Sequence, residues 1–314
     1  MVLHASSDTH AQELTTIADL ECYLSKPAHY PSQPAKLLLL LTSGTGIHST
    51  ANQLQADAFA SHGYLVAMPD QFASDPAPQT HVSTSQTPSQ APSIIESVKL
   101  GLADAAKSFR IDMWLARHTP TTVLPRLHAF VDALGSEFAD CVSYGDGVYG
   151  AGYCFGGRYI MLLSSAVSDD VASGQRKVEA QKDAEEGMVR RGPRVKAGVV
   201  AHGTMVGREE FETLAAPTGI VAVKADPLFP DEVRDEGVRQ AKSRDVEVEV
   251  WVHDDVPHGM YRLPFVDDDV RIKDHDGLTE YTIGFAVVGE YEDQKVREAQ
   301  KSAFEQMLGF LDAH

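Results

Sequence analysis

Residues 152–157, Gly-Tyr-Cys-Phe-Gly-Gly, have the composition and spacing of a nucleophile elbow. An apolar stretch at 147–152 predicts a strand before the turn, and 155–167 predicts a helix after it, which is the context that such an elbow requires. The glycines two positions before and after Cys154 let the strand and the helix approach each other. A thiol held at a helix N-terminus is expected to have a lowered pKa, because backbone N–H groups favour thiolate. We therefore predict nucleophilic catalysis by Cys154, with a buried structural thiol as the alternative.

An elbow nucleophile needs a carboxylate and a histidine later in the chain, in that order. Asp226 directly follows a predicted strand at 219–225, and His258 follows the predicted strand at 246–252 and precedes a glycine. Side chains at the carboxyl ends of parallel strands gather where α/β sites form. We predict His258 as the base and Asp226 as its orienter. The alternatives are a helix N-cap for Asp226 and a loop histidine for His258.

One more histidine and the cysteine spacing bear on the site. His202 ends the predicted strand at 195–201, so it is a candidate pocket residue. The three cysteines, Cys22, Cys141 and Cys154, form no CxxC pair and no zinc-finger pattern. We therefore expect no metal and no cofactor. An odd number of cysteines without a signal peptide favours reduced thiols in the cytoplasm.

The elements that would position these residues alternate between strands and helices. The run of five leucines at 37–41, with turn residues at 43–46 after it, predicts a strand that is buried on both faces. Alternation of this kind predicts an α/β fold with a mostly parallel central sheet and helices on both faces. The predicted strands are an opening strand or hairpin at 14–24, then 37–41, 64–68, 147–152, 195–201, 219–225 and 246–252. The predicted helices are 51–62, 123–134, 155–167, 231–243 and 296–313.

A chain of 314 residues fits a single α/β domain, 1–314, with insertions. Three segments have the composition of insertions, near 73–93, 169–194 and 264–291. The first is rich in Pro, Ser, Thr and Gln, which predicts a long loop that can form part of the site.

The charge of the chain excludes some partners. The formal net charge is −18, from 45 acidic and 27 basic residues, and such a surface repels nucleic acid and anionic membranes. No apolar run approaches 18 residues, and Met1–His10 has no features of a secretory signal. We expect a cytoplasmic protein, monomer or homodimer, that acts on a small molecule.

Taken together, the motifs resemble the dienelactone hydrolase family of the α/β-hydrolase superfamily, in a fungal-type branch. The matching pieces are Tyr64–Asp70, the elbow at 152–157, Asp226 with Pro230 four residues later, and His258 with its glycine. The resemblance implies an α/β-hydrolase fold and hydrolysis of an ester or lactone by a Cys–His–Asp triad. It also implies an oxyanion hole made by the backbone N–H groups of Phe155 and Gly44.

The resemblance also suggests substrate-binding candidates. Ser43 stands where bacterial members carry a glutamate that contacts the cysteine, and Arg262 matches one of two arginines that hold a substrate carboxylate. Candidates for the second arginine are Arg110 and Arg117, which flank Trp114 in a helical stretch. Each arginine could equally be a surface residue. Tyr153 and His202 complete the candidate set.

The sequence leaves two alternatives to a carboxylate-recognising lactone hydrolase. One is a broader esterase or thioesterase on neutral acyl substrates, which the missing glutamate and second arginine slightly favour. The other is a non-catalytic binding scaffold with a relict triad.

Overall fold

The computed structural model describes residues 12–78, 110–166, 192–254, 256, 258–259 and 294–314. Within these ranges eight strands form one sheet, in the order β1-β2-β4-β3-β5-β6-β7-β8. The first two strands pair in antiparallel fashion and β2 runs antiparallel to β4, whereas every later pairing is parallel. The strands are β1 (Gln12–Ile17), β2 (Leu20–Ser25), β3 (Lys36–Leu41), β4 (Tyr64–Pro69), β5 (Val148–Tyr153), β6 (Gly198–Ala201), β7 (Thr218–Val223) and β8 (Val248–His253).

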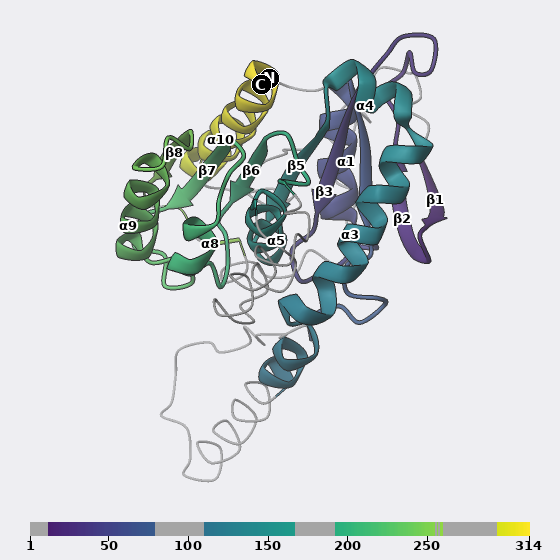
Figure 1. Ribbon diagram of the computed structural model, residues 1–314. Helices are drawn as coiled ribbons and strands as arrows, with labels where there is room; N and C mark the ends of the chain where they lie inside the picture. The colour runs from purple at the N-terminus through teal and green to yellow at the C-terminus, as the bar shows by residue number, and fades with distance from the viewer. Residues whose placement is uncertain (1–11, 79–109, 167–191, 255, 257, 260–293) are drawn as a thin grey trace, which may run out of the picture.

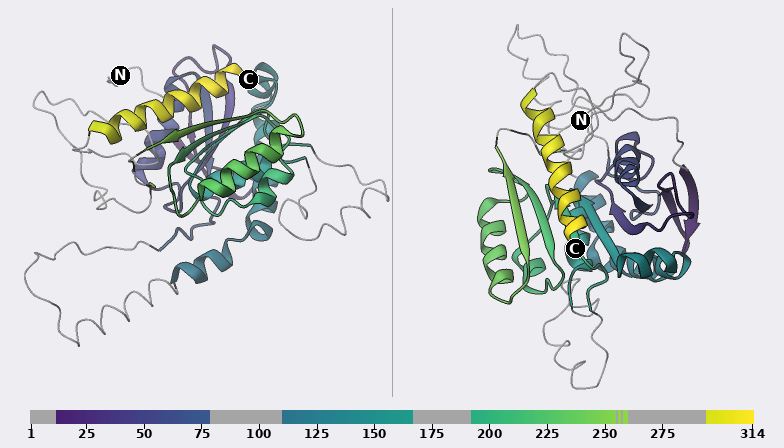
Figure 2. Two further views of the ribbon diagram at one scale, coloured as in Figure 1. Left: turned by 90° about the vertical axis from the view of Figure 1, so that its left-hand side faces the viewer. Right: turned by 90° about the horizontal axis from the view of Figure 1, so that it is seen from above.

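Helices cover both faces of this sheet (Figures 1 and 2). One face carries α1 and α10, and the other carries α5 together with the remaining helices. The helices are α1 (Thr50–Ser61), α3 (Pro120–Glu137), α4 (Ala139–Gly145), α5 (Phe155–Leu163), α8 (Arg208–Glu212), α9 (Asp231–Lys242) and α10 (Gln294–Ala313). Among the described residues, no helix combines the length and apolar character needed to cross a bilayer.

The leucine run of β3 shows why the sheet needs two helical layers. Side chains along a strand alternate between its faces. Leu37, Leu39 and Leu41 accordingly pack in the core on the α5 side, and Leu38 and Leu40 pack in the core on the α1 and α10 side. All five are buried, so neither face of this central strand tolerates water.

The α/β-hydrolase fold predicted from the sequence is confirmed, including the opening hairpin and the parallel order of the later strands. The three predicted insertions fall largely outside the described residues. Of the first, residues 73–78 are described and form a loop after β4. The single-domain assignment of the whole chain stays a prediction.

Candidate active site

Cys154 occupies a strained turn between β5 and α5. Its backbone has φ 53° and ψ −114°, in the positive-φ region that residues with side chains rarely adopt. The flanking glycines make this turn possible. A Cβ on Gly152 would lie 2.5 Å from the carbonyl oxygen of Gly156, and a Cβ on Gly156 would overlap the carbonyl oxygen of Leu41. The steric reason given for the elbow glycines therefore applies to this chain.

Four neighbouring parallel strands deliver the polar groups of the site. Cys154 follows β5, His202 and Thr204 follow β6, Asp226 follows β7, and His258 lies shortly after β8. Because these strands are adjacent and parallel, their carboxyl ends meet at one edge of the sheet. All five side chains are buried there.

Hydrogen-bond distances link four of these side chains in series. Cys154 Sγ lies 3.1 Å from Thr204 Oγ1, and Thr204 Oγ1 lies 3.2 Å from His258 Nε2. On the other side of the imidazole, His258 Nδ1 lies 2.5 Å from Asp226 Oδ2. When Nδ1 carries the proton and donates it to Asp226, Nε2 presents a lone pair towards Thr204 and Cys154.

Asp226 is also held from its other oxygen. Its Oδ1 accepts a hydrogen bond from the backbone N–H of Leu228 at 2.9 Å, which leaves Oδ2 for His258. The N-cap position of α9 is occupied by Pro230. The carboxylate thus closes a short turn after β7 while facing the imidazole, which is different from the capping role considered as an alternative.

The pKa of Cys154 differs from the sequence-based expectation. Burial raises the pKa of the thiol to about 12, although hydrogen bonds from Thr204 and from the backbone N–H groups of Phe155 and Gly44 act to lower it. The sulfur is completely buried, so removal of water from the thiolate outweighs these three donors. The expectation of a lowered pKa was wrong because it counted the helix N-terminus without the desolvation.

The same two backbone N–H groups matter for a second reason. Phe155 is the first residue of α5, and Gly44 lies in the loop after β3. Donors from these positions reach the sulfur from two different strand ends. A carbonyl oxygen bound next to the sulfur would lie close to both donors, in the arrangement needed to stabilise an oxyanion.

His202 lies directly beside the base. Its Nδ1 is 3.4 Å from His258 Nε2, and the two rings meet edge to face with centroids 4.7 Å apart. Burial lowers the pKa of His202 well below its usual value, and the neighbouring His258 lowers it further. Its backbone also adopts a positive φ of 38°. Tyr153 packs near this imidazole, with ring centroids 6.2 Å apart.

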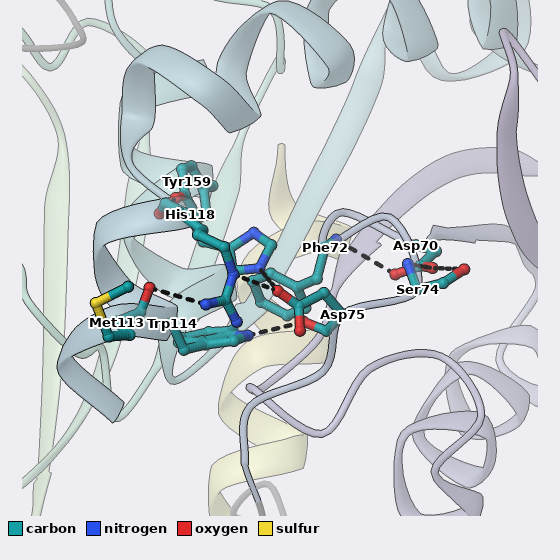
Figure 3. Close-up of polar contacts among 9 residues, drawn as sticks. Asp70, Phe72, Ser74, Asp75, Met113, Trp114, His118 and Tyr159 are labelled. Carbon is teal, nitrogen blue, oxygen red and sulfur yellow. Dashed lines mark hydrogen bonds and ion pairs between the residues drawn. The ribbon is translucent and has the colours of Figure 1, made fainter. Parts of the chain in front are cut away.

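Trp114 contributes to an aromatic cluster beside the elbow. Its ring lies 5.0 Å from that of Phe155 and 4.9 Å from that of Phe72, measured between centroids. The indole Nε1 donates to the backbone oxygen of Asp75 at 2.7 Å (Figure 3). The helical stretch at 110–117 is thereby attached to the loop after β4.

The predicted arginines have different surroundings. Arg117 Nε lies 2.9 Å from the Asp75 carboxylate. The same carboxylate accepts from His118 Nε2 at 3.0 Å (Figure 3). Hydrogen bonds from Arg117 and His118 lower the pKa of Asp75. Arg110 is exposed, and Arg262 lies outside the described residues. Ser43 is buried, with its Oγ 2.9 Å from Thr45 Oγ1.

Thr204 was missed by sequence reasoning. A threonine in a loop carries no motif of its own, and its neighbour His202 drew attention to the segment instead. The signal that could have found it is position, because Thr204 lies three residues past the end of β6, beside the elbow strand. Its backbone N–H donates to the carbonyl oxygen of Cys154 at 3.1 Å, which ties this loop to the nucleophile.

Comparison with known proteins gives two fungal relatives. Hydrolase pyvD of Aspergillus violaceofuscus is 29% identical over 247 residues, covering 79% of this chain and 78% of that protein. Hydrolase tropI of Talaromyces stipitatus is 24% identical over 303 residues, covering 96% of this chain and 89% of that protein.

Two solved structures share the fold. One, from Klebsiella pneumoniae and assigned as a dienelactone hydrolase, has a TM-score of 0.58 at 15% identity and covers 98% of this chain and 100% of its own. The other is a dienelactone hydrolase-like promiscuous phosphotriesterase from metagenomic libraries, with a TM-score of 0.50 at 14% identity, covering 97% and 98%.

The sequence itself carries the family assignment. Residues 20–174 match the sequence model of the dienelactone hydrolase family, a range that includes the strand of the leucine run and the whole elbow. The fungal relatives extend the similarity over the later strands. Residues 20–174 therefore place this part of the chain with the dienelactone hydrolase family, the described elements form the α/β-hydrolase fold, and the protein is a carboxylic ester hydrolase.

Proposed function

We propose that the protein hydrolyses its ester or lactone through an acyl-enzyme on Cys154, with His258 as general base and Asp226 as its orienter. The observation that carries this proposal is the series of contacts from Cys154 Sγ through Thr204 Oγ1 and His258 to Asp226 Oδ2, at 3.1, 3.2 and 2.5 Å. Nucleophile, base and orienter in such a series are the arrangement that activates a weak nucleophile.

The raised pKa of the thiol fixes the starting protonation state. At neutral pH the Cys154 thiol is protonated, because its pKa is about 12. Its S–H can donate to Thr204 Oγ1, whose own O–H donates to His258 Nε2, while Nδ1–H donates to Asp226. In this arrangement every donor has an acceptor. The proton leaves sulfur only as the sulfur attacks.

The reaction then runs in two halves. In the first, the sulfur attacks the carbonyl carbon and its proton passes by way of the Thr204 hydroxyl to His258 Nε2. The N–H groups of Phe155 and Gly44 stabilise the oxyanion. His258 returns the proton to the departing alkoxide as the C–O bond breaks, leaving a thioester on Cys154. In the second half, water gives a proton to His258 and attacks the thioester. The carboxylic acid is released and the proton returns to the sulfur.

We further propose that the preferred substrates are neutral esters. Two observations support this choice. The charge of Arg117 is paired with Asp75, and Arg110 is exposed. The Phe155 ring lies beside Gly44, 3.4 Å from where a Cβ on that glycine would stand, and it packs against Trp114. Apolar contact therefore favours a neutral acyl group, although a carboxylate-bearing lactone is the natural competitor.

Hydrolysis of p-nitrophenyl acetate by Cys154→Ala tests the nucleophile. We expect a loss of at least about a thousandfold in kcat, since nucleophile removal abolishes the covalent route. Cys141→Ala is the matched control, because that thiol is equally buried but lies in α4. Mass spectrometry of the acid-quenched wild type should show the acetyl group on the peptide that contains Cys154. Turnover by Cys154→Ala at the wild-type rate would overturn the assignment.

A competition experiment tests the substrate class. The wild type is offered a neutral aryl ester and a carboxylate-bearing lactone at equal concentration. We expect the neutral ester to have the larger kcat/KM. A preference for the lactone would mean that a cationic clamp exists, and Arg262 would then be the residue to replace.

A further inference from the structure

The buried cluster of Cys154, His202 and His258 has the donor set of a metal site. Their ligand atoms, one sulfur and two ring nitrogens, all lie within 4.8 Å of one another. A thiolate with two imidazoles suits zinc and similar thiophilic divalent ions, whereas magnesium and calcium prefer oxygen. The proposed hydrolase chemistry uses the cysteine and one of the two histidines, which leaves the second histidine to be explained.

The spacing of the two nitrogens matches zinc. Tetrahedral coordination with Zn–N bonds of about 2.0–2.1 Å places two nitrogen ligands about 3.3–3.4 Å apart. His202 Nδ1 and His258 Nε2 are 3.4 Å apart. Zinc would hold sulfur and nitrogen about 3.6 Å apart. Because every pair of ligand atoms lies within 4.8 Å, each sulfur–nitrogen distance has to shorten by about 1.2 Å at most.

The surroundings of the two histidines also suit a metal. Asp226 accepts from His258 Nδ1 at 2.5 Å, which turns Nε2 towards the other two ligands. A carboxylate behind a ligating histidine is the usual way in which metal sites orient the ring and raise its basicity. His202 meets the His258 ring edge to face, with centroids 4.7 Å apart.

We propose that Cys154, His202 and His258 bind a zinc-like divalent ion, with a water or the Thr204 hydroxyl at the fourth position, and that this ion inhibits the hydrolase. Binding forms a metal–sulfur bond and releases the thiol proton to solvent. The inhibition rests on the proposed function. A coordinated sulfur cannot attack a carbonyl, and a coordinated Nε2 cannot accept a proton. The substrate has to reach the Cys154 sulfur from solvent, and the ion would enter by the same path.

Cobalt provides a direct measurement of the site. Full-length chelator-treated protein is titrated with Co²⁺, and we expect a thiolate-to-cobalt charge-transfer band that saturates at one ion per chain and disappears when Zn²⁺ is added. Cys154→Ser should lose the band and Cys141→Ser should keep it. His202→Asn should weaken Co²⁺ binding by at least about tenfold. An equal affinity in His202→Asn, or a band that follows Cys141, would overturn the proposal.

A labelling experiment keeps the test independent of how the variants fold. In the wild type, Zn²⁺ should slow iodoacetamide labelling of the Cys154 peptide while leaving the Cys141 peptide unchanged. Equal labelling of Cys154 with and without Zn²⁺ would contradict the site.

Turnover distinguishes failure of the metal site from failure of the hydrolase proposal. Zn²⁺ should abolish p-nitrophenyl acetate hydrolysis, EDTA should restore it, and Mg²⁺ should have no effect. If the protein shows the cobalt band but no turnover that depends on Cys154, the metal site is supported and the hydrolase mechanism is rejected. If turnover depends on Cys154 but no band appears, the hydrolase mechanism is supported and the metal site is rejected. Faster turnover with Zn²⁺ would refute inhibition.

Discussion

The hydroxyl of Thr204 lies between the nucleophile and the base, so its removal is a direct test of the proposed proton path. We consider Thr204→Val, which replaces the hydroxyl by a methyl group of similar size. The backbone hydrogen bond from Thr204 to the Cys154 carbonyl does not involve the side chain and should persist. The substitution therefore removes two contacts, at 3.1 Å to Sγ and 3.2 Å to Nε2, and little else.

The size of the effect follows from what the hydroxyl contacts during the reaction. It lowers the pKa of Cys154, so its loss makes the sulfur harder to ionise. A hydrogen bond to a charged group contributes about 1.5–3 kcal/mol. With about 1.36 kcal/mol for each factor of ten in rate, we expect kcat/KM to fall by about 10- to 150-fold.

Two assays measure this loss independently. The first is p-nitrophenyl acetate hydrolysis, and the second is the rate of iodoacetamide labelling at Cys154, which depends on thiolate and not on the acyl group. Both rates should fall in Thr204→Val. Thr204→Ser retains the hydroxyl and should recover most of the activity. A thermal melt of each variant shows whether the fold is intact.

Two outcomes would refute this role of Thr204. Thr204→Val with rates within twofold of wild type would mean that Cys154 and His258 exchange the proton directly. A loss in Thr204→Ser as large as that in Thr204→Val would mean that the hydroxyl does not account for the effect, because serine keeps the hydroxyl.

Three further predictions concern the orienter, the elbow and the core. Asp226→Asn should fold normally and lose at least about a hundredfold in kcat, because an amide allows the wrong imidazole tautomer. Near-wild-type turnover would mean that Asp226 only stabilises the turn in which it accepts from the Leu228 N–H. Gly156→Ala should lower the free energy of unfolding by at least about 2 kcal/mol through overpacking. Gly309→Ala in α10 is the control: nothing lies within 4 Å of the added Cβ, so the same urea titration should show no destabilisation. Burial raises the pKa of Cys22 from 9.0 to about 12, so its neutral thiol contributes stability that is complete below pH 9 and is lost as pH rises towards 12. In Cys22→Ala the free energy of unfolding should fall less steeply between these pH values, by up to about 1.4 kcal/mol per pH unit. Identical slopes of unfolding free energy against pH in the wild type and the variant would contradict this.

The sequence was sufficient to predict the fold and the elbow for physical reasons that are local. A run of five leucines followed by turn residues suits a central strand that is buried on both faces. At the turn from β5 into α5, a Cβ on Gly152 or Gly156 would clash with the backbone. The opening hairpin was predicted only as an alternative to a single strand. Its turn uses positive φ values at both Ala18 and Asp19, and the alanine does not signal one.

What the sequence did not predict depends on surroundings that are distant along the chain. The raised pKa of Cys154 results from complete burial, which involves all the strand ends around it. Arg117 was a candidate for binding a substrate carboxylate, yet its partner is Asp75, 42 residues earlier. Thr204 matters because β6 pairs with β5, a neighbour relation that spacing alone does not give.

The delivery of the functional groups by four adjacent strands also has an evolutionary consequence. Backbone hydrogen bonds between β5, β6, β7 and β8 hold the strand ends about 4.8 Å apart. That spacing does not depend on the length of chain between consecutive strands. The connection from α5 to β6, for example, spans residues 164–197, yet Thr204 still lies against Cys154. Connections on this scaffold can therefore lengthen, shorten or diverge in sequence without separating the reacting atoms, so substrate range can change while the chemistry is kept.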